Sequence, residues 1–281
     1  MNFKRLITIS RPRFWLYEFG TYAIGVLAGL AILDTETLIP VAIFALYFLL
    51  PANVLIYGVN DVYDYETDLK NPKKFGYEQV LEPLHHKKLL TVVVLSSLPF
   101  ALYALTLSLG AALAFFTFLF FAVFYSAPPL RAKTKPFFDS LFSAGHYVAT
   151  GVFGYLLVGG GSEWVLLALA GMCWAMAMHA YSAVPDISAD QAVGMKTIAI
   201  IFGPKGTIII CALLYTIAAS IGAHYLGFVS LLLLLPYLYL LRLSYGQPSD
   251  ALMSIYKKFP LVNATVGMIL TLLVLLGNPL L

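Results

Sequence analysis

The stretch "IPVAIFALYFLLPANVLIYGV" at residues 39–59 runs directly into "NDVYDYETD" at residues 60–68. The first part is apolar apart from Asn53, and it is long enough to cross a hydrocarbon core of about 30 Å as a helix. The second part places four acidic side chains within nine residues. A spanning helix that ends in such a cluster indicates a polar functional site where the membrane meets water.

The composition of the whole chain agrees with a membrane protein. Of its 281 residues 60% are hydrophobic and 11% are charged, and the mean hydropathy is +0.86. A soluble domain of this size carries more charge and fewer long apolar runs. The net charge of +3 gives no sign of a nucleic-acid partner. Cys173 and Cys211 both fall inside apolar runs, where a thiol is typically structural and not a metal ligand.

Apolar runs predict an all-α, polytopic membrane fold with nine transmembrane helices in a bundle around a central cavity. A β-barrel would show short alternating strands instead. The predicted spans are residues 14–33, 38–60, 89–109, 111–127, 138–160, 164–184, 206–223, 225–241 and 261–280.

The basic residues test this assignment of spans. All 17 Lys and Arg residues fall before the first span or in alternate connections, so all of them lie on one side of the predicted bundle. The connections on the other side carry acids or no charge, as in "DTET" at 34–37 and "GGGSE" at 159–163. The positive-inside rule then puts the N-terminus in the cytoplasm and the C-terminus outside.

We read the first apolar run as a retained span and not as a cleaved signal, because further spans follow it. No linker divides the chain, so we expect one domain over residues 1–281. The two long cytoplasmic connections, 61–88 and 185–205, indicate an active site at the cytoplasmic face of the cell membrane.

If the second span stays helical through its acidic end, a rotation of about 100° per residue puts four polar side chains on one face about 100° wide. Glu66 points away from that face. Asn53 and Tyr57 extend it into the membrane and suggest a polar pocket. The four side chains are those of Asn60, Asp61, Asp64 and Asp68.

A second acidic cluster follows the sixth span, in "PDISADQAVGMKT" at residues 185–197. Asp186 and Asp190 are four residues apart and share a helix face. His179 joins that face unless Pro185 kinks the helix first. We therefore expect the two clusters to face one another across a cavity.

The five Asp residues of the two clusters would repel one another strongly without cations between them. Oxygen-only ligands favour a hard cation, and two Mg²⁺ ions would offset part of the negative charge of the five Asp residues and a substrate diphosphate. A solvated helix end is the alternative for any single Asp. Basic side chains on the same side complete the balance, namely Lys70, Arg131, Lys133, Lys135 and Lys196.

These motifs resemble the UbiA-type intramembrane prenyltransferase superfamily. "NDVYDYETD" matches the pattern N-D-x-x-D-x-x-x-D, and "DISADQAVGMKT" is similar to D-x-x-x-D followed by G-x-K-x-T or a related sequence. "YSAPPLRAK" at 125–133 is similar to the segment after the family's fourth helix. The resemblance covers nearly the whole chain.

The resemblance implies Mg²⁺-dependent transfer of an isoprenyl group from its diphosphate to a lipophilic acceptor. The metal ligands it implies are Asn60, Asp61, Asp64, Asp68, Asp186 and Asp190. It gives catalytic roles to Asp64, Asp68, Asp186, Asp190 and Tyr125, the last through its ring face, although a Tyr near the interface is also a common membrane anchor. The diphosphate contacts it implies are Asn60, Arg131, Lys133 and Lys196.

Two short segments point to an acceptor. "SRPRFWLYEFGTYAIG" at 10–25 and "DYETDLKNPKK" at 64–74 resemble the carotenoid-directed lycopene elongase/hydratase branch, which implies a dimethylallyl donor and a linear C40 carotenoid acceptor. An aromatic quinone precursor or another lipid is the alternative acceptor. The spans hold no Lys or Arg apart from those at their cytoplasmic ends, which favours an uncharged acceptor.

Three ionisable residues within the spans have open roles. Glu18 either acts on the product cation or pairs with Arg13 or another interfacial cation. His146 and His179 either line the cavity or satisfy polar groups between helices. A transporter with intramembrane carboxylates is the alternative of a different class, but transporters typically place such charges near the bilayer midplane. A soluble chain-elongating synthase is disfavoured, since the DDxxD motifs are absent.

Overall fold

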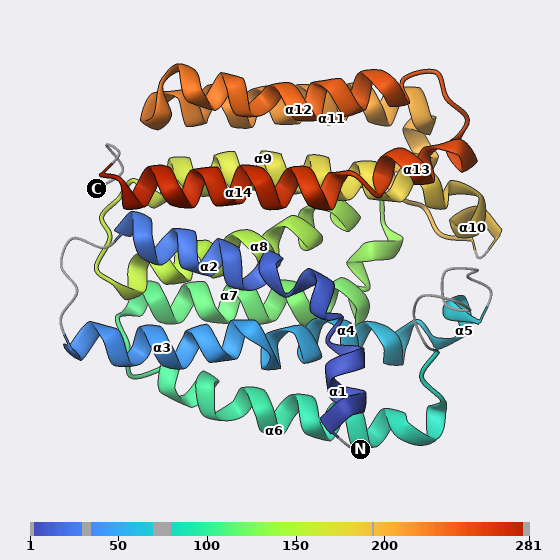
Figure 1. Cartoon of the computed structure of the whole chain (residues 1–281). Coiled ribbons are helices and arrows are strands. Elements are labelled where there is room, and N and C mark those ends of the chain that lie inside the picture. Colours follow the sequence, from blue (N-terminus) through green and yellow to red (C-terminus); the bar gives the residue numbers. More distant parts are fainter. Residues whose placement is uncertain (1–2, 30–34, 70–79, 193, 278–281) are drawn as a thin grey trace.

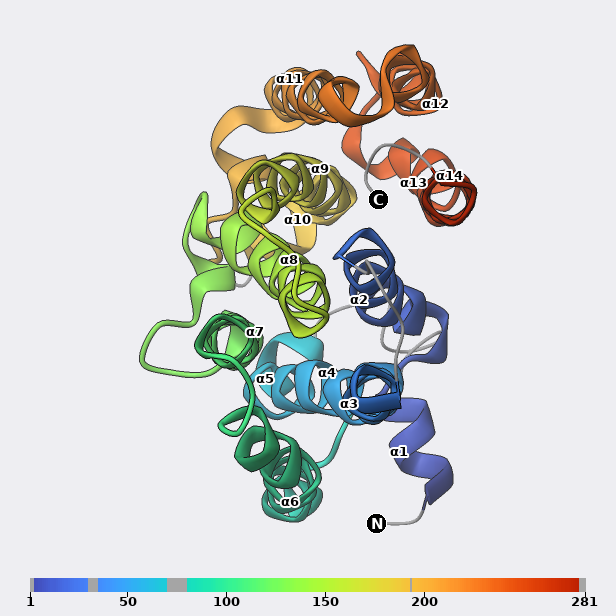
Figure 2. The same cartoon turned by 90° about the vertical axis from the view of Figure 1, so that its left-hand side faces the viewer.

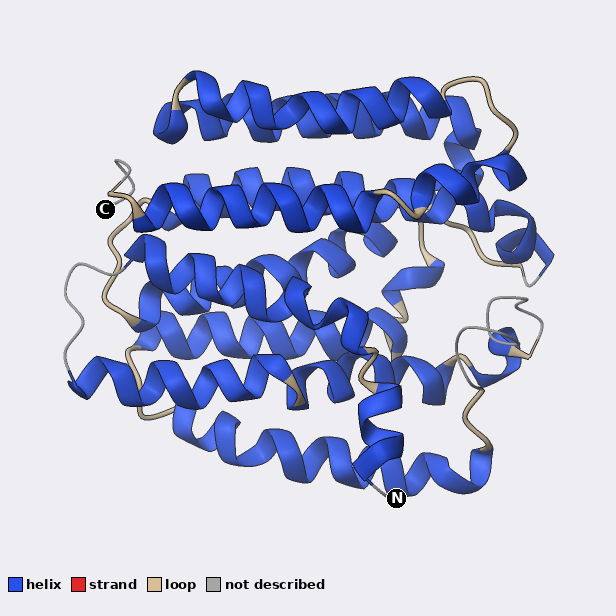
Figure 3. Cartoon of the chain, viewed as in Figure 1, coloured by secondary structure: helices blue, strands red, loops and turns tan. Residues whose placement is uncertain are grey.

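A computed structural model describes residues 3–29, 35–69, 80–192 and 194–277. All regular structure in these ranges is helical (Figure 3). The α-helices are α1 (Phe3–Ile9), α2 (Trp15–Gly29), α3 (Thr35–Leu49), α4 (Pro51–Tyr63), α5 (Tyr65–Asp68), α6 (His86–Ala104), α7 (Leu109–Ser126), α8 (Phe138–Leu157), α9 (Trp164–Ala183), α10 (Ile187–Ala192), α11 (Ile198–Leu226), α12 (Phe228–Ser244), α13 (Met253–Tyr256) and α14 (Phe259–Leu275). The 3₁₀ turns are η1 (Pro12–Phe14), η3 (Pro83–His85), η4 (Ala132–Thr134), η5 (Val184–Asp186) and η6 (Ser249–Leu252).

The long helices lie roughly side by side, and the short helices α5, α10 and α13 gather at one end of the bundle (Figure 1). Seen along the bundle, α8 lies between α7, α2 and α9 (Figure 2). The segments that hold the two acidic motifs, α4–α5 and η5–α10, therefore reach the same end. That end is where the sequence predicts the site.

A helix lies in every one of the nine predicted spans, within the residues that the structure describes. In the part of the chain that the structure describes, six segments are long and apolar enough to cross a membrane: Glu36–Tyr63, Pro83–Ala104, Leu109–Ser126, Trp164–Ala192, Ile198–Leu226 and Met253–Leu275. Phe228–Ser244 is a shorter apolar helix. The chain is thus a multi-pass membrane protein, and the count of nine crossings and their orientation stay predictions.

The second predicted span is two helices and not one. The backbone leaves the helical conformation at Leu50 (φ −125°, ψ −60°), and Pro51 starts α4 because it has no N–H to donate. The buried amide of Asn53 donates to the carbonyl oxygens of Phe48 and Leu49 at 2.9 and 3.1 Å. Asn53 therefore completes the end of α3, and it does not line the cavity.

Glycines allow α2 to approach α8 closely. A Cβ atom at Gly25 would lie 2.0 Å from the carbonyl oxygen of Gly151, and one at Gly154 would lie 2.5 Å from that of Tyr22. Gly25 and Gly29 form a G-x-x-x-G pair on α2, a spacing typical of close helix contacts in membranes. This contact fixes which side chains of the two helices meet closer to the site.

Aromatic side chains fill two cores. Phe44, Phe48, Phe115 and Phe153 pack against one another with ring centroids 4.6–6.3 Å apart, and each is fully buried. Tyr181, Tyr215, Tyr237 and Phe259 belong to the other core. The phenylalanines of the first core are thus packing residues, and tyrosine is the most frequent residue type in the described lining of the cavity between the cores.

Outer helix faces expose large aliphatic side chains, as expected for contact with lipid. Leu109 on α7 is 75% exposed and Leu261 on α14 is 72% exposed. The two cysteines are unpaired and buried, as predicted.

Candidate active site

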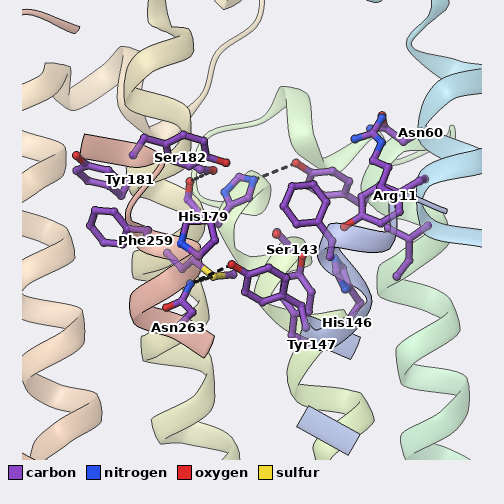
Figure 4. A pocket seen from close by; sticks show the side chains of 18 residues that line it. Arg11, Asn60, Ser143, His146, Tyr147, His179, Tyr181, Ser182, Phe259 and Asn263 are labelled. Atoms are coloured by element: carbon purple, nitrogen blue, oxygen red, sulfur yellow. Dashed lines mark hydrogen bonds between the residues drawn. The ribbon is translucent and has the colours of Figure 1, made fainter. Parts of the chain in front are cut away.

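A cavity of about 230 Å³ opens between α2, α4, α7, α8, α9 and α14 (Figure 4). Its walls combine tyrosine rings with a few polar side chains, among them Arg11, Asn60, His146, His179 and Asn263. The cavity runs from Asn60, at the acidic end of α4, to the apolar middle of the bundle. The cavity therefore joins a polar mouth to an aromatic interior.

The helix is interrupted at the centre of the first acidic motif. α4 ends at Tyr63, Asp64 adopts φ −104° and ψ 3°, and α5 covers only Tyr65–Asp68. The predicted continuous helix through residue 68 is therefore wrong. Burial still separates the side chains as the helical wheel predicts, since Asp61, Asp64 and Asp68 are buried and Glu66 is exposed.

Arg11 neutralises the start of this motif. Its Nη2 donates to Oδ1 of Asp61 at 2.8 Å, and its guanidinium lies 4.6 Å from the centre of the Tyr57 ring. Asn60, one residue earlier, donates from Nδ2 to Oγ of Ser126 at 3.1 Å and so ties α4 to the end of α7.

The segment after α7 supplies two cations to Asp64. The ammonium of Lys133 forms an ion pair with Oδ2 of Asp64, and Nη2 of Arg131 lies 3.9 Å from Oδ1. Arg131 also donates to the carbonyl oxygen of Tyr63 at 3.2 Å. Its backbone is left-handed (φ 42°), and the next turn, η4, carries Lys133 into a buried position.

The second acidic motif reaches the same end through a broken helix. α9 ends at Ala183, and η5 and α10 carry Asp186 and Asp190. Both carboxylates are half-buried. Lys196 follows α10 and is exposed. Lys70, Lys73 and Lys74 lie outside the described residues.

Carboxylates of both acidic motifs influence the pKa of Lys133. Burial lowers the pKa of its ammonium, and the charge of Arg11 lowers it further. The carboxylates of Asp190 and Asp61 raise it. Carboxylates of both motifs therefore act on Lys133, as expected if the two motifs share one site.

The donor set fits a hard cation. Oδ1 of Asp64 is a buried carboxylate oxygen without a hydrogen bond, and carboxylate oxygens are the ligands that Mg²⁺ prefers. In the described ranges, no three acidic, His or Cys side chains lie close enough together to hold a metal ion. Arg11 and Lys133 instead form ion pairs with Asp61 and Asp64, which the sequence interpretation assigns to metal.

Tyr125 and His179 form a pair in the cavity wall. The Tyr125 hydroxyl lies 2.9 Å from Nε2 of His179, and Oγ of Ser140 lies 3.2 Å from Nδ1. His179 lies near the end of α9, and the turn η5, which holds Pro185, follows before Asp190 on α10. It is a cavity residue, one of the two alternatives for its role.

Glu18 pairs with His146 and not with Arg13. Nδ1 of His146 lies 2.7 Å from Oε1 of Glu18, and both side chains are buried. The guanidinium of Arg13 instead lies 4.5 Å from the centre of the Phe14 ring.

The sequence interpretation missed two residues of this end. The sequence interpretation used Arg11 only to orient the chain in the membrane, although Arg11 is predicted to lie on the same side as the acidic motifs. Asp139 was not singled out, and its Oδ2 accepts a hydrogen bond from the Ile198 amide at 3.0 Å. Asp139 thus ties the start of α8 to the segment after the second motif. Its position at the start of a predicted span, on the side that the basic residues share, was the available signal.

Comparison with known proteins identifies relatives of the chain. The profile of the UbiA prenyltransferase family matches residues 22–250. The lycopene elongase/hydratase of Haloferax volcanii is 40% identical over 95% of this chain and 87% of its own length, and that of Haloarcula japonica is 38% identical over 96% and 90%. A UbiA homolog from Archaeoglobus fulgidus, bound to DMAPP and Mg²⁺, shares the fold with a TM-score of 0.69 at 17% identity, over 95% of this chain and 98% of that chain.

Proposed function

Because the chain belongs to the UbiA prenyltransferase family, we propose that this membrane enzyme transfers a five-carbon prenyl group from dimethylallyl diphosphate to an end of a linear C40 carotenoid such as lycopene. The proposed acceptor rests on one observation: two lycopene elongase/hydratases are 38–40% identical to this chain over nearly its whole length. Family membership already establishes a prenyltransferase, so the transporter alternative falls away.

The cavity supports a short donor and one end of a long acceptor. Its volume of about 230 Å³ is below the roughly 300–1,000 Å³ of typical ligand pockets. A five-carbon chain and a polyene end are small enough for such a space. The remainder of a C40 chain extends out of the cavity into the lipid.

The charge of the walls supports an uncharged acceptor. Arg11 is the one Lys or Arg side chain in the described lining of the cavity, and it already pairs with Asp61. A carboxylated aromatic acceptor would need a further cation in the apolar part, where the walls offer tyrosines and histidines. An aromatic quinone precursor stays the second candidate acceptor.

We assign Mg²⁺, in two ions, to Asn60, Asp61, Asp64, Asp68, Asp186 and Asp190. The oxygen donors and the unsatisfied Oδ1 of Asp64 support this assignment. When bound, the metal ions neutralise the diphosphate and stabilise it as a leaving group.

The other side chains of the site bind and orient the substrates. Arg11, Arg131 and Lys133 place positive charge around the position of the diphosphate, and Lys196 adds a further charge from the exposed side. The ring of Tyr125, held by His179, faces the cavity and stabilises the allylic cation. The aromatic walls exclude water until the acceptor has reacted.

We place the site at the cytoplasmic face of a single domain that spans residues 1–281. The support is the segregation of all 17 basic residues onto one side of the predicted spans. The substrates then meet at the cytoplasmic end of a bundle surrounded by membrane lipid.

The test compares two acceptors with one donor. Purified protein receives Mg²⁺, labelled dimethylallyl diphosphate, and either lycopene or a hydroxybenzoate quinone precursor, and both labelled products and released pyrophosphate are measured. We expect elongated carotenoid from lycopene, and Asp64→Asn serves as the inactive control. A prenylated aromatic product with unchanged lycopene would reject the carotenoid acceptor and leave the prenyltransferase assignment intact.

A further inference from the structure

Glu18 and His146 form an ionisable pair in the interior of the bundle, away from the acidic motifs. Their side chains are 1% and 4% exposed, and Nδ1 of His146 lies 2.7 Å from Oε1 of Glu18. Burying an acid and a base between spanning helices is costly, so such groups typically have a function. The metal clamp and the diphosphate contacts use neither residue.

The contact between α2 and α8 holds this pair in place. The hydroxyl oxygens of Thr21 and Thr150 lie 2.6 Å apart one turn further along the two helices. The close approach of Gly25 to Gly151 follows about one turn later. Three contacts along about two turns of α2 therefore fix the position of the His146 ring relative to the cavity.

The pair leaves one ring nitrogen of His146 available. Because a carboxylate only accepts hydrogen bonds, Nδ1 of His146 is the donor to Glu18, and in a neutral ring Nε2 then has a free lone pair. No hydrogen-bond partner for Nε2 occurs among the described residues, and the ring lines the cavity beside Tyr147, at 4.1 Å between ring centres (Figure 4). Both nitrogens of His179, by contrast, have partners in Tyr125 and Ser140.

We propose that His146 is the general base that adds water to the product cation, and that Glu18 is its positioning residue. This inference rests on the proposed function. Attack of a terminal carotenoid double bond on the prenyl cation leaves a tertiary cation on the acceptor. The water oxygen then forms a C–O bond to that carbon, one of its O–H bonds breaks, and the proton passes to Nε2 of His146.

The products of this step are a tertiary alcohol and an imidazolium ion. The carboxylate of Glu18, 2.7 Å from Nδ1, stabilises the charge on the ring, as an Asp does for the His of a catalytic triad. The imidazolium returns its proton to solvent when the product leaves. Tyrosine hydroxyls, the other abundant polar groups in the walls, are weak bases and do not compete for this proton. The word hydratase in the names of the two relatives requires such a water addition in those proteins.

The experiment measures the hydrated fraction of the elongated product. Full-length wild type, His146→Gln, Glu18→Gln and Glu18→Asp are assayed with lycopene, dimethylallyl diphosphate and Mg²⁺ in H₂¹⁸O, and mass spectrometry separates ¹⁸O-labelled alcohol from alkene. We expect the hydrated fraction to fall at least tenfold in His146→Gln and to fall in Glu18→Gln, with recovery in Glu18→Asp. The control Ser230→Ala removes a buried hydrogen bond from Ser230 on α12 to the carbonyl oxygen of Ala219 on α11, and it should leave the hydrated fraction unchanged.

The outcomes separate this inference from the proposed function. An unchanged hydrated fraction in both His146→Gln and Glu18→Gln overturns the inference, and so does an elongated wild-type product without ¹⁸O. Failure of the wild type to elongate lycopene rejects the proposed acceptor and this inference with it. If a variant does not fold, the wild type is compared in H₂O and D₂O. The slower deuteron transfer should then lower the hydrated fraction, and an equal fraction in both solvents overturns the inference.

Discussion

The guanidinium of Arg11 donates to the carboxylate of Asp61 at 2.8 Å, across 50 residues of sequence. The same guanidinium lies 4.6 Å from the centre of the Tyr57 ring, in the wall of the cavity. Arg11 thus joins the N-terminal segment to the first acidic motif, at the place where we expect the diphosphate.

We predict that Arg11→Gln raises the KM for the prenyl diphosphate at least tenfold at saturating Mg²⁺. A charge-assisted hydrogen bond contributes about 1.5–3 kcal/mol, which corresponds to roughly a tenfold to hundredfold change in affinity. Arg13→Gln is the matched control, because Arg13 is exposed and lies over the ring of Phe14. Equal KM values for Arg11→Gln and wild type would refute a role for Arg11 in binding the diphosphate.

We predict that Asp64→Asn lowers turnover by at least about a hundredfold, because the buried carboxylate is assigned to both metal and catalysis. Glu66→Gln makes the same chemical change two residues away on an exposed side chain, and it should stay within twofold of wild type. Pyrophosphate release under saturating substrates measures both. Full turnover of Asp64→Asn would show that the metal assignment is wrong.

The sequence predicted the helical fold because its signals are local. Each span is a continuous apolar run, and the segregation of basic residues tests the assignment without any knowledge of tertiary contacts. The breaks were harder to see. Pro51 lies inside an apolar run that is long enough for one helix, and only the structure shows that the backbone turns at Leu50.

The site was only partly predictable, because local sequence signals reveal its acidic motifs and not the residues that pair with them. The spacing of Asp61, Asp64 and Asp68 defines a face, and their burial agrees with it. The partners of the ionisable residues are distant in sequence: Arg11 lies 50 residues from Asp61, and His146 lies 128 residues from Glu18. Such pairings depend on how the helices pack, and a single sequence does not encode them in any spacing.

We predict that Lys133→Met lowers the free energy of unfolding by about 3–5 kcal/mol, because it removes the closer of the two cations beside the buried carboxylate of Asp64 and leaves Arg131 3.9 Å away. Mg²⁺ with pyrophosphate should raise the melting temperature of this variant more than that of wild type, since the metal replaces the lost cation. Thermal unfolding in detergent measures both effects. Lys135→Met, an exposed neighbour, should stay within about 0.5 kcal/mol of wild type. Equal unfolding curves for Lys133→Met and wild type would contradict the ion pair.

Finally, we predict that Gly25→Ala destabilises the bundle by at least about 1–3 kcal/mol, whereas Gly20→Ala on the same helix does not. A Cβ atom at Gly25 would lie 2.0 Å from the backbone oxygen of Gly151, so α2 and α8 must separate, and nothing lies within 4 Å of a Cβ at Gly20. Alanine at Gly20 should instead stabilise the helix by up to about 1 kcal/mol through its higher helix propensity. Thermal unfolding of both variants in detergent decides the comparison. Because Glu18 lies two turns before Gly25 on α2, loss of this contact should also weaken the hydrogen bond to His146, so that Gly25→Ala lowers the hydrated fraction of the product. Equal melting temperatures for the two variants would show that α2 and α8 are not held by this glycine contact.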